Sequence, residues 1–179
     1  MDIYLETERL VLRRLAESDA DDLVALHNDP EVMFYINGGR PTPREEVVGE
    51  ELPVFMDRLF LAAIEKSTGA FLGWFHLRAQ RGEPEDEPEL GYRLHKSAWG
   101  KGYATEGSRA LVDHAFRVLG ARRVYAETMT VNTASRRVME KSGLRYVRTF
   151  FQDWPDHIEG EELGDVEYEL LRSDWARRT

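Results

Sequence analysis

Residues 99–106 read Trp-Gly-Lys-Gly-Tyr-Ala-Thr-Glu, and they stand where a strand-like stretch gives way to a helix-like one. The preceding residues 89–94 fit a strand, and apolar residues recur at helical spacing after the run. Gly100 and Gly102 let the backbone of such a turn approach a ligand closely, because neither carries a Cβ. The first amide N–H groups of the helix lack intrahelical partners and lie at the positive end of its dipole. The run therefore predicts a binding site for a phosphate group.

The composition is that of a soluble enzyme-sized domain. The chain has 179 residues, of which 42% are apolar and 32% charged. It has no cysteine, so disulfides, thiolate metal ligands and a cysteine nucleophile are excluded. The longest apolar runs are far short of a membrane span, and the acidic N-terminus lacks the apolar region of a secretory signal. We therefore expect a cytoplasmic protein with no membrane partner.

The net charge of −9 is unevenly distributed. Residues 96–148 hold 11 Lys/Arg and 4 Asp/Glu, whereas the rest of the chain holds 13 and 29. A polyanionic ligand at the basic segment and a cationic one elsewhere would explain this division. Solvated helix faces with a chance asymmetry are the alternative. Because no basic stripe dominates the chain, we expect no nucleic-acid partner.

The hydrophobic pattern predicts an α/β fold in one domain. We expect strands over residues 10–15, 59–64, 71–77, 89–94, 123–127, 144–151 and 166–171, and helices over 18–29, 43–58, 103–119 and 132–142. Residues 66–69 are predicted to turn a hairpin, and the acidic segment 152–164 is expected to be mobile.

Other phosphate-binding motifs fit the glycine run poorly. A P-loop needs Gly-x-x-x-x-Gly-Lys-Ser/Thr, which does not occur. A dinucleotide-binding turn would use Gly100 and Gly102, with Glu127 near the place of the ribose-binding acid, but Thr105 stands where the third glycine belongs. The five histidines show no metal-ligand spacing, and no Gly-x-Ser-x-Gly occurs, so we expect neither a metal site nor a serine hydrolase.

A second motif follows the glycine run and helps to identify the ligand that the run binds. Residues 131–144 read Val-Asn-Thr-Ala-Ser-Arg-Arg-Val-Met-Glu-Lys-Ser-Gly-Leu, about 28 residues after Gly102-Tyr103-Ala104. In this order and spacing the two motifs resemble the Gcn5-related N-acetyltransferase (GNAT) superfamily. Residues 6–13, Glu-Thr-Glu-Arg-Leu-Val-Leu-Arg, together with the glycine run resemble its ribosomal-protein-alanine acetyltransferase branch. The resemblance covers residues 6–172, which it implies to be a single GNAT domain.

The resemblance implies a mixed central sheet that is splayed between its fourth and fifth strands, flanked by about four helices, and that grips acetyl-CoA there. The run from Trp99 to Thr105 would bind this cosubstrate, and the amides of residues 100–104 would hold its pyrophosphate. The full cofactor-binding set implied is Tyr92, Arg93, Leu94, Trp99, Gly100, Lys101, Gly102, Tyr103, Ala104, Thr105, Asn132, Ser135 and Arg136.

Within that set the implied roles differ. The backbone at 92–94 would pair with the pantetheine arm as an extra strand. Asn132 would hydrogen-bond polar groups of the pantetheine. Lys101, Arg136 or Arg137 would meet the adenosine phosphates.

The catalytic residues depart from the superfamily at one position. Many relatives place a tyrosine seven residues after the motif asparagine, where it protonates the departing thiolate, and this chain has Met139 there. Ser135 resembles the serine that the branch uses near the sulfur, and Tyr103 is a weaker candidate. Glu89 is the candidate base that takes a proton from the amine through water, although it could instead only attract a cationic amine. A backbone N–H near Leu94 would hold the oxyanion.

We therefore expect an acetyl-CoA-dependent N-acetyltransferase that acts on an amine acceptor, either a protein N-terminus or a small cationic amine. The alternative is a catalytically weak acyl-CoA-binding regulatory or interaction domain. It stays open because Met139 stands where many relatives have the proton-donating tyrosine. Assembly as a homodimer also stays open.

Overall fold

The computed structural model describes residues 2–178, which divide into two compact parts. The first part comprises residues 2–76 and 92–107, and the second comprises residues 77–91 and 108–178. Two strands and one helix contribute residues to both parts: β4 (Phe71–Arg78), β5 (Glu89–Leu94) and α5 (Tyr103–Arg117).

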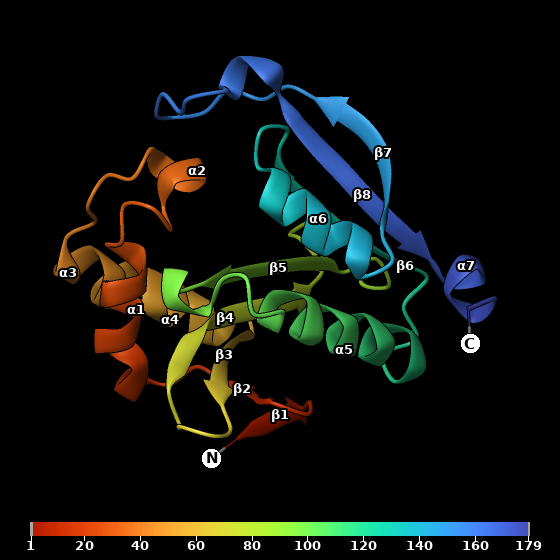
Figure 1. The fold of residues 1–179 in the computed structure, drawn as a ribbon, viewed down its shortest axis with the longest axis horizontal. Helices are drawn as coiled ribbons and strands as arrows, with labels where there is room; N and C mark the ends of the chain where they lie inside the picture. Colours follow the sequence, from red (N-terminus) through yellow and green to blue (C-terminus); the bar gives the residue numbers. More distant parts are fainter. Residues whose placement is uncertain (1, 179) are drawn as a thin grey trace. The chain divides into compact units, whose positions relative to one another are not determined.

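The first part is built on antiparallel strands. The strand β1 (Ile3–Glu6) pairs with β2 (Leu10–Arg14), β2 pairs with β3 (Phe60–Glu65), and β3 pairs with β4 (Figure 1). The β3–β4 connection is the expected hairpin, closed by the Gly69 N–H, which donates to the Glu65 carbonyl at 2.8 Å. At the end of β5, the His95 N–H donates to the Leu72 carbonyl at 2.8 Å and joins this strand to β4.

The first part also contains several short helices. They are α1 (Ala20–His27), α2 (Phe34–Asn37), α3 (Arg44–Glu46) and α4 (Leu52–Asp57), with a π-helical turn at Val47–Glu51 between the last two and short 3₁₀ turns at Glu17–Asp19 and Lys96–Ala98. Leu23 and Leu26 of α1 and Leu52 of α4 are buried against Phe60 and Trp74 of the strands. Burial of this apolar face is the main source of stability for the first part.

The second part is a smaller sheet with a helix against it. The strand β6 (Arg123–Met129) pairs antiparallel with β8 (Asp165–Leu171), which pairs antiparallel with β7 (Arg145–Phe150). In Figure 1 the two blue strands β7 and β8 lie side by side, with α6 (Thr133–Lys141) next to them. Within residues 2–178, the parallel ladder between β5 and β6 comprises the single register pair Glu89–Tyr125. A 3₁₀ turn at Glu161–Leu163 precedes β8, and α7 (Arg172–Ala176) follows it.

The α/β fold class is confirmed, and the expected strands and helices are present with bounds within two residues. The expectation of about four helices is corrected, because the described chain also has α2 and α7, and β1 precedes the first expected strand. These three elements have four or five residues each, too few to show a period, and β1 depends on β2 for its pairing. Among the described helices, none combines the length and the apolar character that a bilayer crossing requires.

Gly73 controls how closely β4 and β5 approach. Its φ is 143°, which residues with a side chain rarely adopt. A Cβ at this position would lie 2.1 Å from the Arg93 carbonyl oxygen and 2.7 Å from the Leu94 Cα. Both are backbone atoms of β5, so neither can move aside without displacing that strand.

We predict that Gly73→Ala lowers the free energy of unfolding by about 3 kcal/mol or more, because overpacking against backbone cannot relax. Gly49→Ala is the matched control. Gly49 lies in the π-helical turn, and a Cβ added there would have no neighbouring atom within 4 Å, so we expect a change within about 1 kcal/mol. Urea denaturation of both variants measures the difference, and equal small effects would contradict the close approach.

Candidate functional site

The glycine turn has the geometry that its sequence predicts. Gly100 and Gly102 have φ values of 69° and 83°, in the left-handed region that glycine tolerates. The Glu106 N–H donates to the Gly102 carbonyl at 2.9 Å, so α5 starts directly after this glycine. The N–H groups of the first turn of α5 therefore have no intrahelical acceptor. This is the local arrangement that binds a phosphate.

Trp99 closes the segment that leads into the turn. Its indole Nε1–H donates to the Leu94 carbonyl at 3.0 Å, while 47% of the residue is exposed. The Leu94 carbonyl is therefore already used inside the protein, and the Tyr92 and Arg93 backbone stays the predicted pairing edge for a pantetheine arm.

Glu106 ties the glycine run to the N-terminal motif. Its carboxylate accepts hydrogen bonds from Thr7 Oγ1 at 2.7 Å, from the Arg9 backbone N–H at 2.8 Å and from Arg9 Nε at 2.7 Å. Arg9 also donates from Nη1 to the Lys101 carbonyl at 3.0 Å, and its guanidinium lies 4.2 Å from the centre of the Tyr103 ring. Partial burial opposes ionisation of Glu106, but the hydrogen bonds from Thr7 and Arg9 outweigh it and keep the pKa of Glu106 low.

Tyr103 is held by a carboxylate. Its hydroxyl donates to Glu65 Oε1, and Glu65 Oε2 accepts from Thr68 Oγ1 at 2.6 Å. The hydrogen bond to Glu65 raises the pKa of Tyr103. A phenol whose proton is bound in this way is a poor proton donor to a thiolate, which agrees with its lower rank among the candidates.

Tyr92 and Arg93 point to opposite faces of β5. The Tyr92 ring centre lies 6.1 Å from that of Phe75, and Phe75 contacts Gly107 of α5 so closely that a Cβ there would come within 2.4 Å of the ring. Arg93 instead lies over the Trp74 ring, at 4.9 Å from its centre. The residues Ala104 and Thr105 belong to the first turn of α5.

In the second part, Asn132 is the N-cap of α6. Its Oδ1 accepts the Ser135 N–H at 3.2 Å, so the carbonyl end of the side chain is used for capping. The Nδ2 hydrogens remain as donors for a ligand. Ser135 lies in the first turn of the same helix, and Met139 one turn later is only 2% exposed. The position that carries a tyrosine in many relatives is therefore filled by a core residue.

Arg136 is partly committed inside the protein. Its Nε donates to the Tyr168 hydroxyl and its Nη1 to the Thr130 carbonyl, both at 3.0 Å. The contact predicted between Arg136 and the adenosine phosphates stays a prediction, for which the remaining N–H groups are available.

Glu89 lies on an acidic sheet face. It is the register partner of Tyr125 on β6, and the alternation of a strand places Glu127 on the same side as Tyr125. Gln80 Nε2 donates to the Glu89 carboxylate. Glu167, the register partner of Glu127, is paired with Arg123 and with Arg148.

Glu127 is the uncompensated acid of this face. Within residues 2–178 its carboxylate has no hydrogen bond or ion pair, in contrast to Glu167. The residue is exposed, yet desolvation of its carboxyl group and the nearby charges of Glu89 and Glu167 raise the pKa of Glu127 to about 7. A carboxyl group that titrates near neutral pH is suited to accept a proton from an amine. Sequence reasoning missed this role, because only the pairing of β6 with β5 and β8 reveals Glu127's neighbours.

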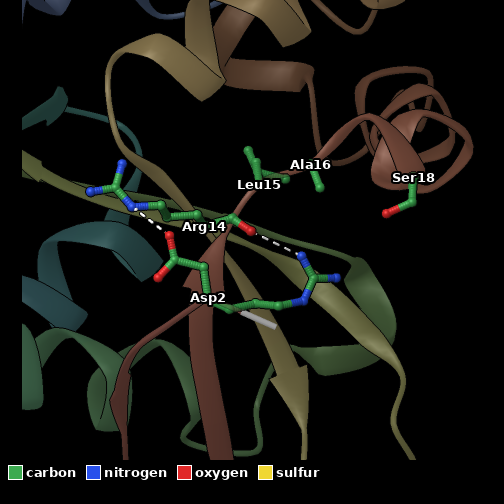
Figure 2. A pocket seen from close by; sticks show the side chains of 6 residues that line it. Asp2, Arg14, Leu15, Ala16 and Ser18 are labelled. Atoms are coloured by element: carbon green, nitrogen blue, oxygen red, sulfur yellow. Dashed lines mark hydrogen bonds and ion pairs between the residues drawn. The ribbon is translucent and has the colours of Figure 1, made fainter.

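A hollow at the end of β2 is lined by a different set of residues. Figure 2 shows its lining, which includes Asp2, Arg14 and Ser18, and in it Arg14 pairs with Asp2 at 3.0 Å. Arg13, also at its wall, makes a bidentate contact with Asp19. None of its lining residues belongs to the predicted cofactor-binding set.

Comparison with known proteins gives a consistent family. A family model described as "Acetyltransferase (GNAT) domain" matches residues 9–145. A relative from Aspergillus fumigatus named FsC-acetyl coenzyme A-N(2)-transacetylase is 35% identical, over 97% of this chain and 78% of its own. The crystal structure of a GNAT-family acetyltransferase from Bacillus anthracis is 26% identical, covers 97% of this chain and 99% of its own, and has a TM-score of 0.82. A spermidine N-acetyltransferase from Vibrio cholerae, solved with CoA and spermine, shares the fold at 17% identity, with 94% of this chain and 98% of its own covered and a TM-score of 0.75.

We predict that Glu106→Ala lowers the free energy of unfolding by about 1–3 kcal/mol, because the Arg9 N–H and the Thr7 hydroxyl lose their acceptor in a half-buried place. Glu8→Ala is the control, since Glu8 is an exposed acid in the same motif, and we expect it to have almost no effect. Chemical denaturation measures both, and an equal loss in the two variants would mean that the Glu106 contacts carry no particular weight.

Proposed function

Because the chain belongs to the GNAT acetyltransferase family, we propose that it transfers the acetyl group of acetyl-CoA directly to a primary amine, which is a protein N-terminus or a small cationic amine. Family membership makes it an N-acetyltransferase that uses acetyl-CoA. The acceptor, the residue roles and the extent of the catalytic domain, residues 6–172, are the proposed elements. The observation that carries the proposal is the glycine turn at the start of α5, held by Arg9 and Glu106.

Each part supplies groups that suit a different portion of acetyl-CoA. In the first part, the amides of residues 100–104 would bind the pyrophosphate, with the Lys101 ammonium as a counter-charge. The backbone of Tyr92 and Arg93 offers strand-type hydrogen bonds to the pantetheine amides. In the second part, the Asn132 Nδ2 hydrogens are donors to a pantetheine carbonyl, and Arg136 is the candidate for the adenosine phosphates.

The acidic face of β5 and β6 suits the acceptor. An amine is protonated at neutral pH and must lose that proton before its lone pair can attack a carbonyl carbon. Glu127, titrating near pH 7, takes the proton directly or through water, and Glu89 draws the cation to the face. The neutral amine then forms a C–N bond at the thioester carbon, and a backbone N–H near Leu94 stabilises the oxyanion.

The last step needs a proton for the sulfur. The C–S bond breaks as the carbonyl re-forms, and the thiolate leaves. Because Met139 replaces the usual tyrosine and Tyr103 donates to Glu65, the Ser135 hydroxyl or water is the proposed proton donor. As the intermediate collapses, the nitrogen loses its second proton to water, and the proton taken up by Glu127 also returns to water. The products are an acetamide, CoA with a free thiol and one released proton.

Two acceptor classes remain in the proposal. The resemblance of residues 6–13 and 99–106 to the ribosomal-protein-alanine branch favours a protein N-terminus. The name of the relative from Aspergillus fumigatus gives an N(2) atom of FsC as the acetylated position of that protein's substrate, which favours a small molecule. The acidic face favours a cation in either class.

The proposal is tested by following free CoA thiol while acetyl-CoA is offered with N-terminal peptides and with small diamines. We expect turnover with at least one class. Gly102→Val should lose measurable acetyl-CoA affinity, because a β-branched residue resists φ of 83° and crowds the phosphate site. Gly69→Val, at φ of 75° in open space in the hairpin, controls for backbone strain and should bind acetyl-CoA normally. Unchanged affinity of a folded Gly102→Val protein would refute the phosphate-site assignment.

The pH dependence separates the two acids. If Glu127 is the base, kcat/KM for the amine rises with pH through about 7, because the carboxyl must be ionised to accept a proton. Glu127→Gln should abolish that rise and lower kcat roughly 10²-fold or more. Glu89→Gln should instead raise the KM for the amine, and added salt should erase this difference. A pH profile that Glu127→Gln leaves unchanged would remove Glu127 from the mechanism.

A further inference from the structure

A buried polar cluster lies among the aromatic residues of the first part. His27 of α1 is 1% exposed, and its Nδ1 lies 2.5 Å from Oε2 of Glu51 in the π-helical turn. Its Nε2 accepts from Trp74 Nε1 at 3.2 Å and from Arg93 Nη1 at 3.1 Å. Indole and guanidinium groups can only donate, so Nε2 is unprotonated and Nδ1–H donates to Glu51. Burial lowers the pKa of His27, which keeps the ring neutral.

Arg93 is a half-buried cation without a directly contacting carboxylate among the described residues. Within residues 2–178 no carboxylate oxygen lies within ion-pair distance of it. The charge of Glu51 acts on Arg93 from beyond that distance, and the hydrogen bonds between the two residues run through His27. Burial lowers the pKa of Arg93 to about 10. A charge removed from water in a folded protein is ordinarily paired, because desolvation is costly.

The unused donors of Arg93 are accessible. A guanidinium has five N–H groups in a fixed fork, and only Nη1 has a hydrogen-bond partner among the described residues. No nitrogen of Arg93 is sealed from solvent without a partner. The stacking on Trp74 and the bond to His27 fix the guanidinium, so its remaining donors are held ready for an oxygen ligand.

The side to which Arg93 points identifies that ligand. Tyr92 faces Phe75 and the start of α5, which is the side of the glycine turn. Arg93 faces the other side, where α1 and the π-helical turn supply His27 and Glu51. The phosphates of acetyl-CoA at the glycine turn are therefore not the partner of Arg93, and the acceptor is the ligand left to provide one.

We infer that Arg93 binds an oxygen of the acceptor, so that the preferred substrate carries its amine beside a carbonyl or carboxylate, as an amino acid, an amino-acid amide or ester or a peptide N-terminus does. This inference rests on the proposed function and narrows its acceptor class. Simple polyamines, which offer no oxygen, are then poor substrates although their charge suits the acidic face.

Three amines that share one carbon chain test whether an oxygen beside the amine improves the substrate. Lysine has a carboxylate beside its α-amine, lysinamide has a neutral carbonyl there, and cadaverine is the same chain without either. We expect kcat/KM for the better of lysine and lysinamide to exceed that for cadaverine roughly 10- to 100-fold, the range of a charge-assisted hydrogen bond. If lysine has the higher kcat/KM, Arg93 recognises a carboxylate oxygen; if lysinamide has it, Arg93 recognises a neutral carbonyl oxygen.

Arg93→Met should reduce that ratio to about one while the KM for acetyl-CoA stays within about twofold, because the uncharged chain can still cover Trp74. Arg44→Met is the control, since Arg44 is an exposed arginine of the same part paired with Asp21, and it should preserve the ratio. Should Arg93→Met fail to fold, Arg93→Lys keeps the charge but loses the fork, and the ratio should fall several-fold. A parent enzyme that prefers cadaverine, or an equal loss for all three amines in Arg93→Met, would overturn the inference.

Binding measurements test the oxygen site of Arg93 even if no amine is acetylated. Calorimetry of the three amines with CoA-loaded protein should show tighter binding of lysine or lysinamide than of cadaverine, and Arg93→Met should remove the difference. If no amine is acetylated but this Arg93-dependent preference is present, the proposed function fails and the oxygen site stands. Equal binding of the three amines, or no binding of any, would overturn the oxygen site whether or not acetyl-CoA is consumed.

Discussion

The ion pair between Arg9 and Glu106 is the contact on which the candidate site depends. A glycine-rich turn gains its ligand-binding geometry from backbone freedom, and the same freedom makes it costly to order. Glu106 receives three hydrogen bonds from Thr7 and Arg9, and Arg9 in turn binds the Lys101 carbonyl inside the turn. The turn therefore loses its conformational entropy when the protein folds and not when a phosphate binds. The site is preorganised in this sense.

Several charged side chains that are shielded from solvent have direct partners of opposite charge. Arg123 contacts Glu167 and Glu169 on the second-part sheet, and Arg13 makes a bidentate pair with the buried Asp19. Glu127 and Arg93 lack such partners among the described residues, although desolvation penalises the charge of each. A fold selected for stability alone would pair or remove these groups. Each group has a use in the proposed reaction, because a carboxylate can accept a proton from an ammonium group and a guanidinium can donate hydrogen bonds to an oxygen.

The neutral His27 shows how such a cation is kept in place. A carboxylate in direct contact with Arg93 would occupy the guanidinium fork and compete with any ligand. Here Glu51 acts through the imidazole, which transmits an orienting hydrogen bond without occupying the fork. The π-helical turn places Glu51 opposite His27, a local irregularity of the kind that often marks functional positions in helices.

The sequence by itself determined the parts that local rules govern. The alternation of apolar residues fixed the main strands and helices within two residues, and two glycines before a helix fixed the phosphate-binding turn with its positive φ values. Gly102 could be recognised because left-handed turns have residue preferences that do not depend on distant partners, and Asn132 because the second motif resembles that of a known family. The short elements β1, α2 and α7 were not predicted, because four or five residues are too few to show a hydrophobic period.

Only the tertiary structure decided which charges meet. Thr7 and Arg9 lie nearly a hundred residues before Glu106 in the sequence. Their two motifs could be recognised separately but not as one hydrogen-bonded unit. The pKa of Glu127 depends on Glu89 and Glu167, which the sheet register brings to its strand from opposite ends of the sequence. The sequence assigned only the backbone of Arg93, to the cosubstrate. The contacts of its side chain with His27 and Trp74, which fix the guanidinium, are visible only in the folded structure. Electrostatic energies follow distance in space and burial, and a linear sequence specifies neither until the chain has folded.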